Sequence, residues 1–395
     1  MTRPRLATPL FLLCAAANFL QALAFNLYLH LPGFLHQLGA DEVRIGLLSS
    51  LTAVAAILAR PPVGRSMDAR GRRPVILLGG LINTVVCCLY LAIDAIGPAL
   101  VAVRILHGLS EAMLFSALFT LAADGIPAAR RTEGIALYGV SGILPISLGG
   151  ALGDAILARG SYDALFAASA ALAVGSLLLS LPLREQRAPS RDPAPSRGFA
   201  AAMGQRDLVP LWFLGTVFAT ALAAVFTFVK TWVMETGIGS VGLFFSAYSA
   251  AAVVLRLFFA WLPERVGPKN VLFPALAALG AGLVAMAQAS SPLTVAAAGA
   301  LCGLGHGFTF PILSGFVVHR ARESERGAAL SIFTALFDGG VLIGGPAFGA
   351  IVGAAGYPVM FGSAGALVAA GALAFAPWDR AATRGGGVRT PAARV

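Results

Sequence analysis

The stretch Gly64–Ile76, which reads GRSMDARGRRPVI, is the most polar short passage in the first half of the chain, and long apolar runs flank it. Glycine permits tight turns, and a carboxylate can pair with guanidinium groups across the ends of two helices. We therefore predict a loop that staples helix ends at a membrane surface, although any short loop between membrane helices can be basic. The residues that would form this conformational latch are Gly64, Asp68, Gly71, Arg72 and Arg73.

The composition indicates that most of the chain is in contact with lipid. Of its 395 residues, 58% are hydrophobic and 12% are charged, whereas soluble proteins are about 25% charged. We attribute the net charge of +10 to cytoplasmic loops that face anionic headgroups, and not to binding of nucleic acid. The cysteines lie in apolar segments without metal-ligand spacing, and no nucleotide-binding or catalytic motif is found. We therefore expect no enzyme activity, no cofactor and no metal site.

Apolar runs that are long enough to cross a hydrocarbon core of ~30 Å as helices recur along the chain. Six are expected at roughly 8–32, 43–62, 74–96, 98–123, 132–157 and 162–182, and six more at roughly 208–234, 240–262, 270–289, 292–318, 326–353 and 357–377. The sequence thus predicts an all-α membrane protein with twelve transmembrane helices in two pseudo-symmetric six-helix bundles. The bundles would be residues 1–182 and 208–395, the second with a cytoplasmic tail, and the polar segment 183–207 would be a cytoplasmic linker.

The positions of Lys and Arg predict the orientation. If the N-terminus is cytoplasmic, all but four of the 28 Lys and Arg residues lie in the tails, the linker, or the loops and helix ends on the cytoplasmic side. Such an asymmetry places both termini and the linker inside. We expect a monomeric, multi-pass protein of a bacterial-type inner membrane.

The two halves of the chain resemble each other. Residues 131–150 and 326–345 align without gaps at an offset of 195. A repeat in the same orientation relates the halves by an axis along the membrane normal, with a substrate site between them. Near the opening stretch the offset is 196, and the equivalent pairs there are Asp68 and Glu264, Gly71 and Gly267, and Arg73 and Lys269.

With these features the chain resembles the major facilitator superfamily. The family's loop signature, G-x-x-x-D-R/K-x-G-R/K-R/K, matches the five latch residues, and Ala69 occupies a position where a basic residue is usual. The resemblance implies a secondary transporter that works by alternating access. It also implies that the loop braces the second membrane helix in the outward-facing state.

Two further motifs carry the resemblance and imply proton coupling. The family's helix-4 pattern, L-x-x-x-R-x-x-Q-G, matches Leu100–Gly108, with His107 where Gln is usual. In proton-driven members the arginine of this pattern, here Arg104, is implicated in coupling. The glycines around Pro145 resemble the glycine-proline motif of antiporters, although Leu144 stands where the family has a glycine. A close-packed, kinked helix is the alternative interpretation of those glycines.

Three ionisable residues, Glu111, His306 and Asp338, lie near the middle of expected membrane helices. A charge at the bilayer centre costs roughly 2.5–3.5 kcal/mol on insertion scales, so such residues are candidates for function. Arg104, His107 and Glu111 share one helix face because they are spaced i, i+3, i+7. We expect Glu111 to be a proton-coupling or cation-binding carboxylate that Arg104 modulates; a fixed Arg104–Glu111 pair is the alternative. Asp338 is a second proton-coupling candidate or a substrate contact, with helix capping or packing as the alternative. His306 is a further proton-coupling candidate that could line the cavity opposite Glu111, with a core packing role as the alternative.

Polar and aromatic residues on several helices are candidates for the substrate cavity. The resemblance implies that the first and seventh membrane helices face it. Amides and hydroxyls suit polar contacts with a small solute, and aromatic rings make an apolar, adaptable pocket, although both residue types also pack between helices. The candidates are Asn26, Tyr28, His107, Phe115, Phe226 and Phe310.

The function that these features favour is proton-coupled efflux of a small amphipathic or drug-like molecule. The expected partners are that substrate, protons as the coupling ion, and the lipid bilayer. Proton-coupled uptake of a metabolite is the alternative within transport. A non-transporting membrane sensor with the same fold is the alternative from another class.

Overall fold

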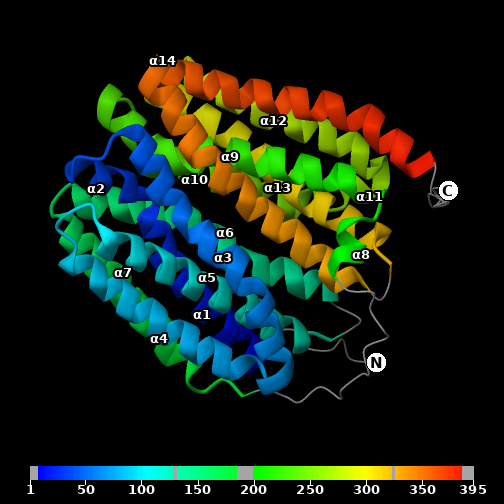
Figure 1. Cartoon of the computed structure of the whole chain (residues 1–395), viewed down its shortest axis with the longest axis horizontal. Helices are drawn as coiled ribbons and strands as arrows, with labels where there is room; N and C mark the ends of the chain where they lie inside the picture. Colours follow the sequence, from blue (N-terminus) through cyan, green and yellow to red (C-terminus); the bar gives the residue numbers. More distant parts are fainter. Residues whose placement is uncertain (1–7, 128–130, 185–198, 323–324, 385–395) are drawn as a thin grey trace.

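The computed structural model describes residues 8–127, 131–184, 199–322 and 325–384, and every regular element in these ranges is a helix (Figure 1). The first half contains α1 Pro9–Asn26, η1 Leu27–His30, α2 Leu31–Gln37, α3 Glu42–Arg70, α4 Arg72–Leu89, η2 Tyr90–Ala92, α5 Pro98–Asp124, α6 Arg131–Leu157 and α7 Tyr162–Ser180. The second contains α8 Phe199–Met203, α9 Val209–Thr236, α10 Val241–Phe258, α11 Leu262–Val266, α12 Pro268–Ala287, α13 Pro292–Arg320 and α14 Arg326–Arg384.

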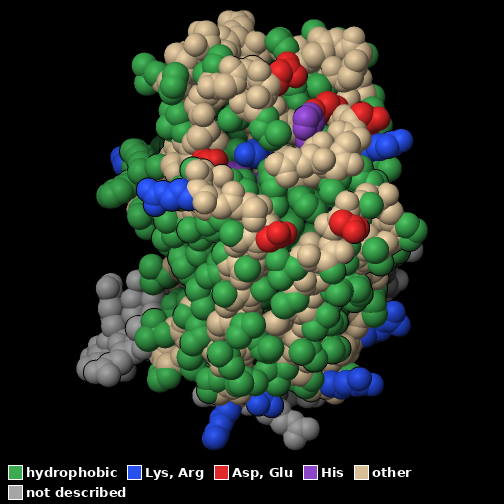
Figure 2. Space-filling view, turned by 90° about the vertical axis from the view of Figure 1, so that its left-hand side faces the viewer, with side chains coloured by type: hydrophobic (Ala, Val, Ile, Leu, Met, Phe, Trp, Pro, Cys, Tyr) green, Lys and Arg blue, Asp and Glu red, His purple; other side chains and the backbone are tan. Residues whose placement is uncertain are grey.

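The predicted fold class, an all-α membrane protein, is confirmed. Eleven stretches of the described chain are long and apolar enough to cross a membrane, and the last of them is Arg326–Thr383. That stretch is broken at Gly356, where φ is 80°, into two helices, so a bundle of twelve membrane-length helices results. Hydrophobic side chains cover most of the molecular face in Figure 2, and the charged groups on it are scattered. The predicted division at 183–207 remains a prediction, since 185–198 lie outside the described residues.

Polar caps start several helices at one end of the bundle. The side chains of Asp41, Ser161, Ser240 and Ser291 accept hydrogen bonds from backbone N–H groups three residues later, at the starts of α3, α7, α10 and α13. Such caps satisfy donors that a helix leaves unpaired at its N-terminus. We call this the Glu42 end of the bundle, because α3 begins there. The opposite end, where α3 stops, is the Gly71 end.

The latch segment lies at the Gly71 end, and its arginines reach the ends of other helices. Gly71 joins α3 to α4 with φ 89°, a left-handed conformation that glycine adopts readily. The Nε atom of Arg72 lies 3.2 Å from Oδ2 of Asp124, the last residue of α5. The Nε atom of Arg73 donates to the carbonyl oxygen of Leu183, just beyond α7, at 2.8 Å. The side chain of Asp68 lies outside the described part of the structure.

The second half repeats this arrangement with a carboxylate in place of a carbonyl. Gly267 has φ 95°, like its equivalent Gly71. The Nζ atom of Lys269, the equivalent of Arg73, lies 2.5 Å from Asp379 near the end of α14. Asp379 is only 1% exposed and also accepts a hydrogen bond from Arg320 at 2.6 Å. Each half therefore fastens the start of its third membrane helix to the end of its last.

Replacing Asp379 with Asn should destabilise the protein strongly. The substitution leaves two cations around a buried amide, and breaking a buried pair by removing one partner costs about 3 kcal/mol or more. We expect a clearly lower midpoint of thermal unfolding in detergent. Asp94→Asn, at an exposed acidic residue, is the control and should leave the midpoint unchanged. Equal midpoints for the two variants would show that the buried cluster contributes little.

Glycines let the two halves touch at the Glu42 end. A side chain at Gly46 on α3 would collide with the backbone of Gly345 on α14. On the other side of the bundle, a Cβ at Gly150 on α6 would lie 3.3 Å from the Cα atom of Gly242 on α10. The repeat relates these two contacts, because Gly46 is equivalent to Gly242 and Gly345 to Gly150. Small residues permit such close backbone approach between membrane helices.

The same two helices separate toward the Gly71 end. Gly64 lies 18 residues after Gly46, and Gly327 lies 18 residues before Gly345. Eighteen residues are about five helical turns, so each pair shares one helix face. A Cβ at Gly64 or at Gly327 would meet no atom within 4 Å. The cleft between the halves is therefore closed at the Glu42 end and open at the Gly71 end.

Candidate functional site

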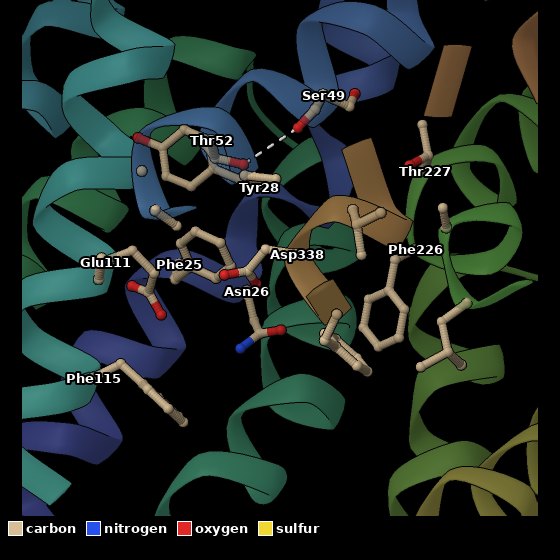
Figure 3. Close-up of a pocket in the computed structure, with 18 of the residues that line it drawn as sticks. Phe25, Asn26, Tyr28, Ser49, Thr52, Glu111, Phe115, Phe226, Thr227 and Asp338 are labelled. Carbon is tan, nitrogen blue, oxygen red and sulfur yellow. Dashed lines mark hydrogen bonds between the residues drawn. The ribbon is translucent and has the colours of Figure 1, made fainter. Parts of the chain in front are cut away.

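A cavity of about 400 Å³ lies between the two halves. Its walls come from α1, η1, α2, α3, α5, α9, α13 and α14, so both halves contribute. In the close-up of Figure 3, Glu111 points into it from α5, Asp338 from α14 and Phe226 from α9. The lining is mostly apolar and aromatic, with a few polar groups, which is typical of sites for small organic molecules.

The structure brings most of the predicted cavity residues together. Asn26, Tyr28, Phe115, Phe226 and Phe310 all line the cavity. Phe115 is 54% exposed even though it lies on an otherwise well-packed helix, so its ring projects into open space. The four residues predicted for proton coupling, Glu111, Arg104, Asp338 and His306, also line the cavity.

His107 does not line the cavity. It is 1% exposed, and its ring packs against Phe25 and Tyr28, with centroids 5.3 and 4.5 Å away. Its Nδ1 atom lies 3.3 Å from the hydroxyl of Tyr90. The cavity-facing stripe of α5 contains Arg104 and residues four, seven, eight and eleven positions later. His107, three residues after Arg104, is therefore turned away from the cavity and lies behind the rings of Phe25 and Tyr28.

Glu111 reaches the cavity without a charged partner in the described part of the chain. Its Oε2 atom accepts a hydrogen bond from the side-chain amide of Gln21 on α1. An amide donor stabilises a carboxylate less than a guanidinium would. In the sequence, Gln21 is only one polar residue among several on the first helix. Its pairing with Glu111 joins residues 90 positions apart, which no local pattern indicates.

Arg104 does not pair with Glu111, and the alternative of a fixed Arg104–Glu111 pair is wrong for this structure. Its Nε atom donates to the carbonyl oxygen of Leu48 at 2.9 Å, and a terminal nitrogen donates to that of Ser49 at 2.6 Å. The other terminal nitrogen lies 3.3 Å from the hydroxyl of Tyr90. Arg104 therefore fastens α5 to the backbone of α3, beside the cavity.

Asp338 forms an ion pair that crosses from one half to the other. The Nε and terminal nitrogen atoms of Arg60 on α3 lie 3.0 and 2.6 Å from its Oδ2 atom. Both side chains are about one-fifth exposed. Pro61 and Pro62 follow Arg60 inside α3, and two glycines follow Asp338 inside α14, so both helices can bend next to the pair. From the sequence, Arg60 is only one of the basic residues near the latch.

His306 lines the cavity from α13, and its Nδ1 atom is hydrogen-bonded to the hydroxyl of Tyr248 on α10. Its ring also packs against Phe218 and Phe310, with centroids 5.5 and 6.4 Å away. One face of this histidine is therefore fixed by aromatic neighbours, while its edge remains at the cavity wall.

Two carboxylates of the first half close the Glu42 end, and neither was expected from the sequence. Glu42 on α3 accepts a hydrogen bond from the hydroxyl of Tyr357 on α14 at 2.8 Å. Asp154 on α6 accepts one from the backbone N–H of Gly242, in the first turn of α10, at 2.6 Å. A carboxylate is favoured at a helix N-terminus. Each of these contacts must break if this end of the cleft opens.

No group of three or more His, Cys, Asp or Glu side chains among the described residues is arranged to hold a metal ion. The cavity thus presents two carboxylates, one imidazole, two guanidinium groups and several aromatic rings to a ligand.

A cavity between two helical halves of a bundle of membrane-length helices, closed at one end and open at the other, is the arrangement expected of a membrane transporter of small molecules. The chain belongs to the Major Facilitator Superfamily, because the model of that family matches residues 11–241 and again 211–394. It is a multi-pass membrane protein of a transporter family.

Curated relatives and solved structures agree with this assignment. The chain is 27% identical over 369 residues to the uncharacterized MFS-type transporter YhhS of Escherichia coli K12, covering 89% of this chain and 88% of that protein. YhhS of Salmonella typhimurium is 27% identical over 370 residues, with the same coverage. The crystal structure of the nucleoside transporter NupG has a TM-score of 0.75 at 16% identity, covering 93% of this chain and 98% of that one.

The human organic anion transporter MFSD10 (TETRAN) shares the fold as well. Its crystal structure has a TM-score of 0.69 at 18% identity and covers 94% of this chain and 100% of that one. At this level of identity the likeness concerns the fold alone.

Removing the Arg60–Asp338 pair should loosen the contact between the halves. We expect Asp338→Asn to broaden and lengthen the distance distribution between spin labels at positions 70 and 326, because an ion pair between α3 and α14 is lost next to two bending points. The double variant Arg60→Asp/Asp338→Arg should restore the narrow distribution. Arg44→Gln removes an exposed pair on the same helix, 3.9 Å from Asp41, and is the control. A swap that fails to restore the distribution would argue against a pair across the halves.

Proposed function

We propose that this protein is a secondary active transporter that works by alternating access and couples proton movement to the efflux of a small amphipathic or drug-like molecule. The observation that carries the proposal is the placement of Glu111. It is a carboxylate in the cavity whose hydrogen-bond donor is an amide, while the other cavity carboxylate, Asp338, is engaged by Arg60. A carboxylate without a cationic partner in an apolar site can take up and release a proton as water access changes.

The roles of the other charged residues follow from their partners. Arg104 acts on the backbone of α3, so it would relay a change at the cavity to the helix that contacts the second half. Asp338 and Arg60 would act as a pair that holds the halves in register. Histidine is the residue type whose unperturbed pKa lies nearest neutrality. His306 would therefore serve as a second proton site or as a polar contact for the substrate.

The latch residues would act at a distance from the chemistry. Arg72 and Arg73 join the start of α4 to the ends of α5 and α7, so they keep the first half rigid at the Gly71 end. A rigid half can rotate as one body about a site between the halves, which is how alternating access is achieved in transporters built from repeats. With the predicted orientation the open end faces the cytoplasm, from which an efflux substrate would load.

Glu111→Gln should abolish proton coupling while substrate binding persists, because the amide keeps the size of the side chain but cannot carry a proton. The measurement is drug-driven proton movement, and its direction, in proteoliposomes with an imposed pH gradient. Glu111→Asp retains the carboxylate and should retain part of the coupling. Asp94→Asn controls for loss of an acidic residue elsewhere. Full coupling in Glu111→Gln would exclude this residue as the proton carrier. Drug movement in the same direction as the protons would contradict proton-driven efflux.

Leucine at two glycines of α3 should shift alternating access in opposite directions. Gly46→Leu collides with the backbone of Gly345 in the present state, so the Glu42 end should open, and labels at positions 37 and 290 should separate. Gly64→Leu has free space here but would fill the Gly71 end of the cleft when that end closes. It should therefore favour the present state and leave those labels close together. Similar label distances in both variants would contradict a rocking motion about the cavity.

A further inference from the structure

Arg256 lies in the last turn of α10, toward the Gly71 end, and makes no hydrogen bond or ion pair with the described part of the chain, even though its Nε atom is buried. Its side chain is directed toward the other half, because a Cβ at Gly139 on α6 would lie 3.6 Å from one of its terminal nitrogens. Buried nitrogen donors in proteins are normally hydrogen-bonded. Among the described residues, the buried Nε atom of Arg256 thus lacks the hydrogen-bond partner that burial requires.

The internal repeat shows which partner is missing. An offset of 196 makes Arg256 the equivalent of Arg60, and an offset of 195 makes Ile143 the equivalent of Asp338. In the first arrangement Arg60 crosses from α3 to α14 and pairs with Asp338. In the second, Arg256 crosses from α10 to α6, where the corresponding side chain is the apolar Ile143.

The close contacts between the halves agree with this equivalence. Arg60 lies 14 residues after Gly46, and Arg256 lies 14 residues after Gly242. Asp338 lies seven residues before Gly345, and Ile143 lies seven residues before Gly150. Both glycine pairs form close contacts between the halves. The terminal nitrogen of Arg256 lies beside Gly139, one helical turn from Ile143 and on the same side of α6.

Arg256 lies on the Gly71 side of the cavity and is not itself one of the lining residues. It follows Tyr248 by eight residues, two turns along the same side of α10, and Tyr248 is hydrogen-bonded to the cavity residue His306. A ligand that entered from the open Gly71 end would therefore pass the guanidinium group on its way to the aromatic part of the cavity.

We propose that Arg256 is a substrate-binding residue and that the substrate is an amphipathic organic anion. Its carboxylate would pair with Arg256 in the same way that Asp338 pairs with Arg60. Guanidinium binds carboxylate in a fixed, two-pronged geometry, and the aromatic rings of the cavity would receive the apolar part. An organic anion would be the substrate class of the transporter proposed above. This inference rests on that proposed function in one respect, namely that the cavity binds the substrate.

Three molecules of similar size and different charge test the proposal: 1-naphthoate, 1-naphthamide and 1-naphthylmethylammonium. The purified full-length protein in a neutral detergent should be stabilised against thermal unfolding by naphthoate more than by the amide or the amine. Arg256→Gln should weaken the apparent affinity for naphthoate by about tenfold or more, as expected for a lost hydrogen bond to a charged group, and leave that for the amide unchanged. Arg256→Lys should recover only part of the loss.

A second pair of variants keeps the test independent of the arginine's own role in folding. Ile143→Asp supplies the missing carboxylate and should compete with naphthoate for Arg256, whereas Ile143→Asn, the matched neutral control, should not. The Asp variant should also unfold at a higher temperature than the Asn variant, and Arg256→Gln should remove that difference.

The proposal is overturned if naphthoate gives no stabilisation at millimolar concentration, if the three molecules stabilise equally, or if the amine is preferred. It is also overturned if phosphatidylglycerol alone produces the Arg256-dependent stabilisation, because the guanidinium would then bind a lipid headgroup. These measurements need no pH gradient. A failure of proton coupling in Glu111→Gln proteoliposomes and a failure of anion binding in detergent are thus separate results.

Discussion

The close approach of α3 to α14 at the Glu42 end is the contact on which the site depends. Gly46 and Gly345 leave no room for a side chain between the two backbones, so the halves meet there as backbone against backbone. The same helices have only free space at Gly64 and Gly327, so the gap between them widens from the contact toward the Gly71 end. The cavity occupies the part of this gap that is wide enough for a solute and still enclosed by side chains.

Two charged groups of the first half, Arg104 and Asp154, are hydrogen-bonded to backbone groups of neighbouring helices. Arg104 donates to two carbonyl oxygens of α3, and Asp154 accepts from the first turn of α10. In an apolar medium a buried charge requires such partners. Backbone groups have the advantage that they move with their helix. A rotation of one half therefore breaks the contact of Asp154 directly, because that contact joins α6 to α10. Arg104 joins two helices of the first half, so it keeps the cavity wall of α5 fixed to the helix that carries Gly46.

The fold could be predicted from the sequence to within a few residues at most helix ends, because lipid demands long apolar helices and because caps such as Ser240 and turns such as Gly71 are local signals. The break at Gly356 falls in the expected gap between two membrane spans. The cavity residues were partly predictable for a related reason, since an ionisable side chain in mid-membrane is costly and is seldom placed there without a functional role. His107 was misplaced, because spacing assigns residues to a face of a helix but does not say how wide the exposed stripe of that face is.

Contacts between the halves could not be predicted in this way. Arg60 and Asp338 are 278 positions apart, and even within one half Gln21 and Glu111 are 90 positions apart; no periodicity relates residues at such distances. The repeat is the one source of long-range information within a single sequence, and it carries more than fold symmetry. Where both copies keep the same residue, as at the contact glycines, it indicates shared packing. Where one copy departs, as with Ile143 in place of an aspartate, the packing is retained and the charge balance is not. That departure leaves the two sides of the cleft chemically different, and a transporter that must hold an asymmetric solute needs such a difference.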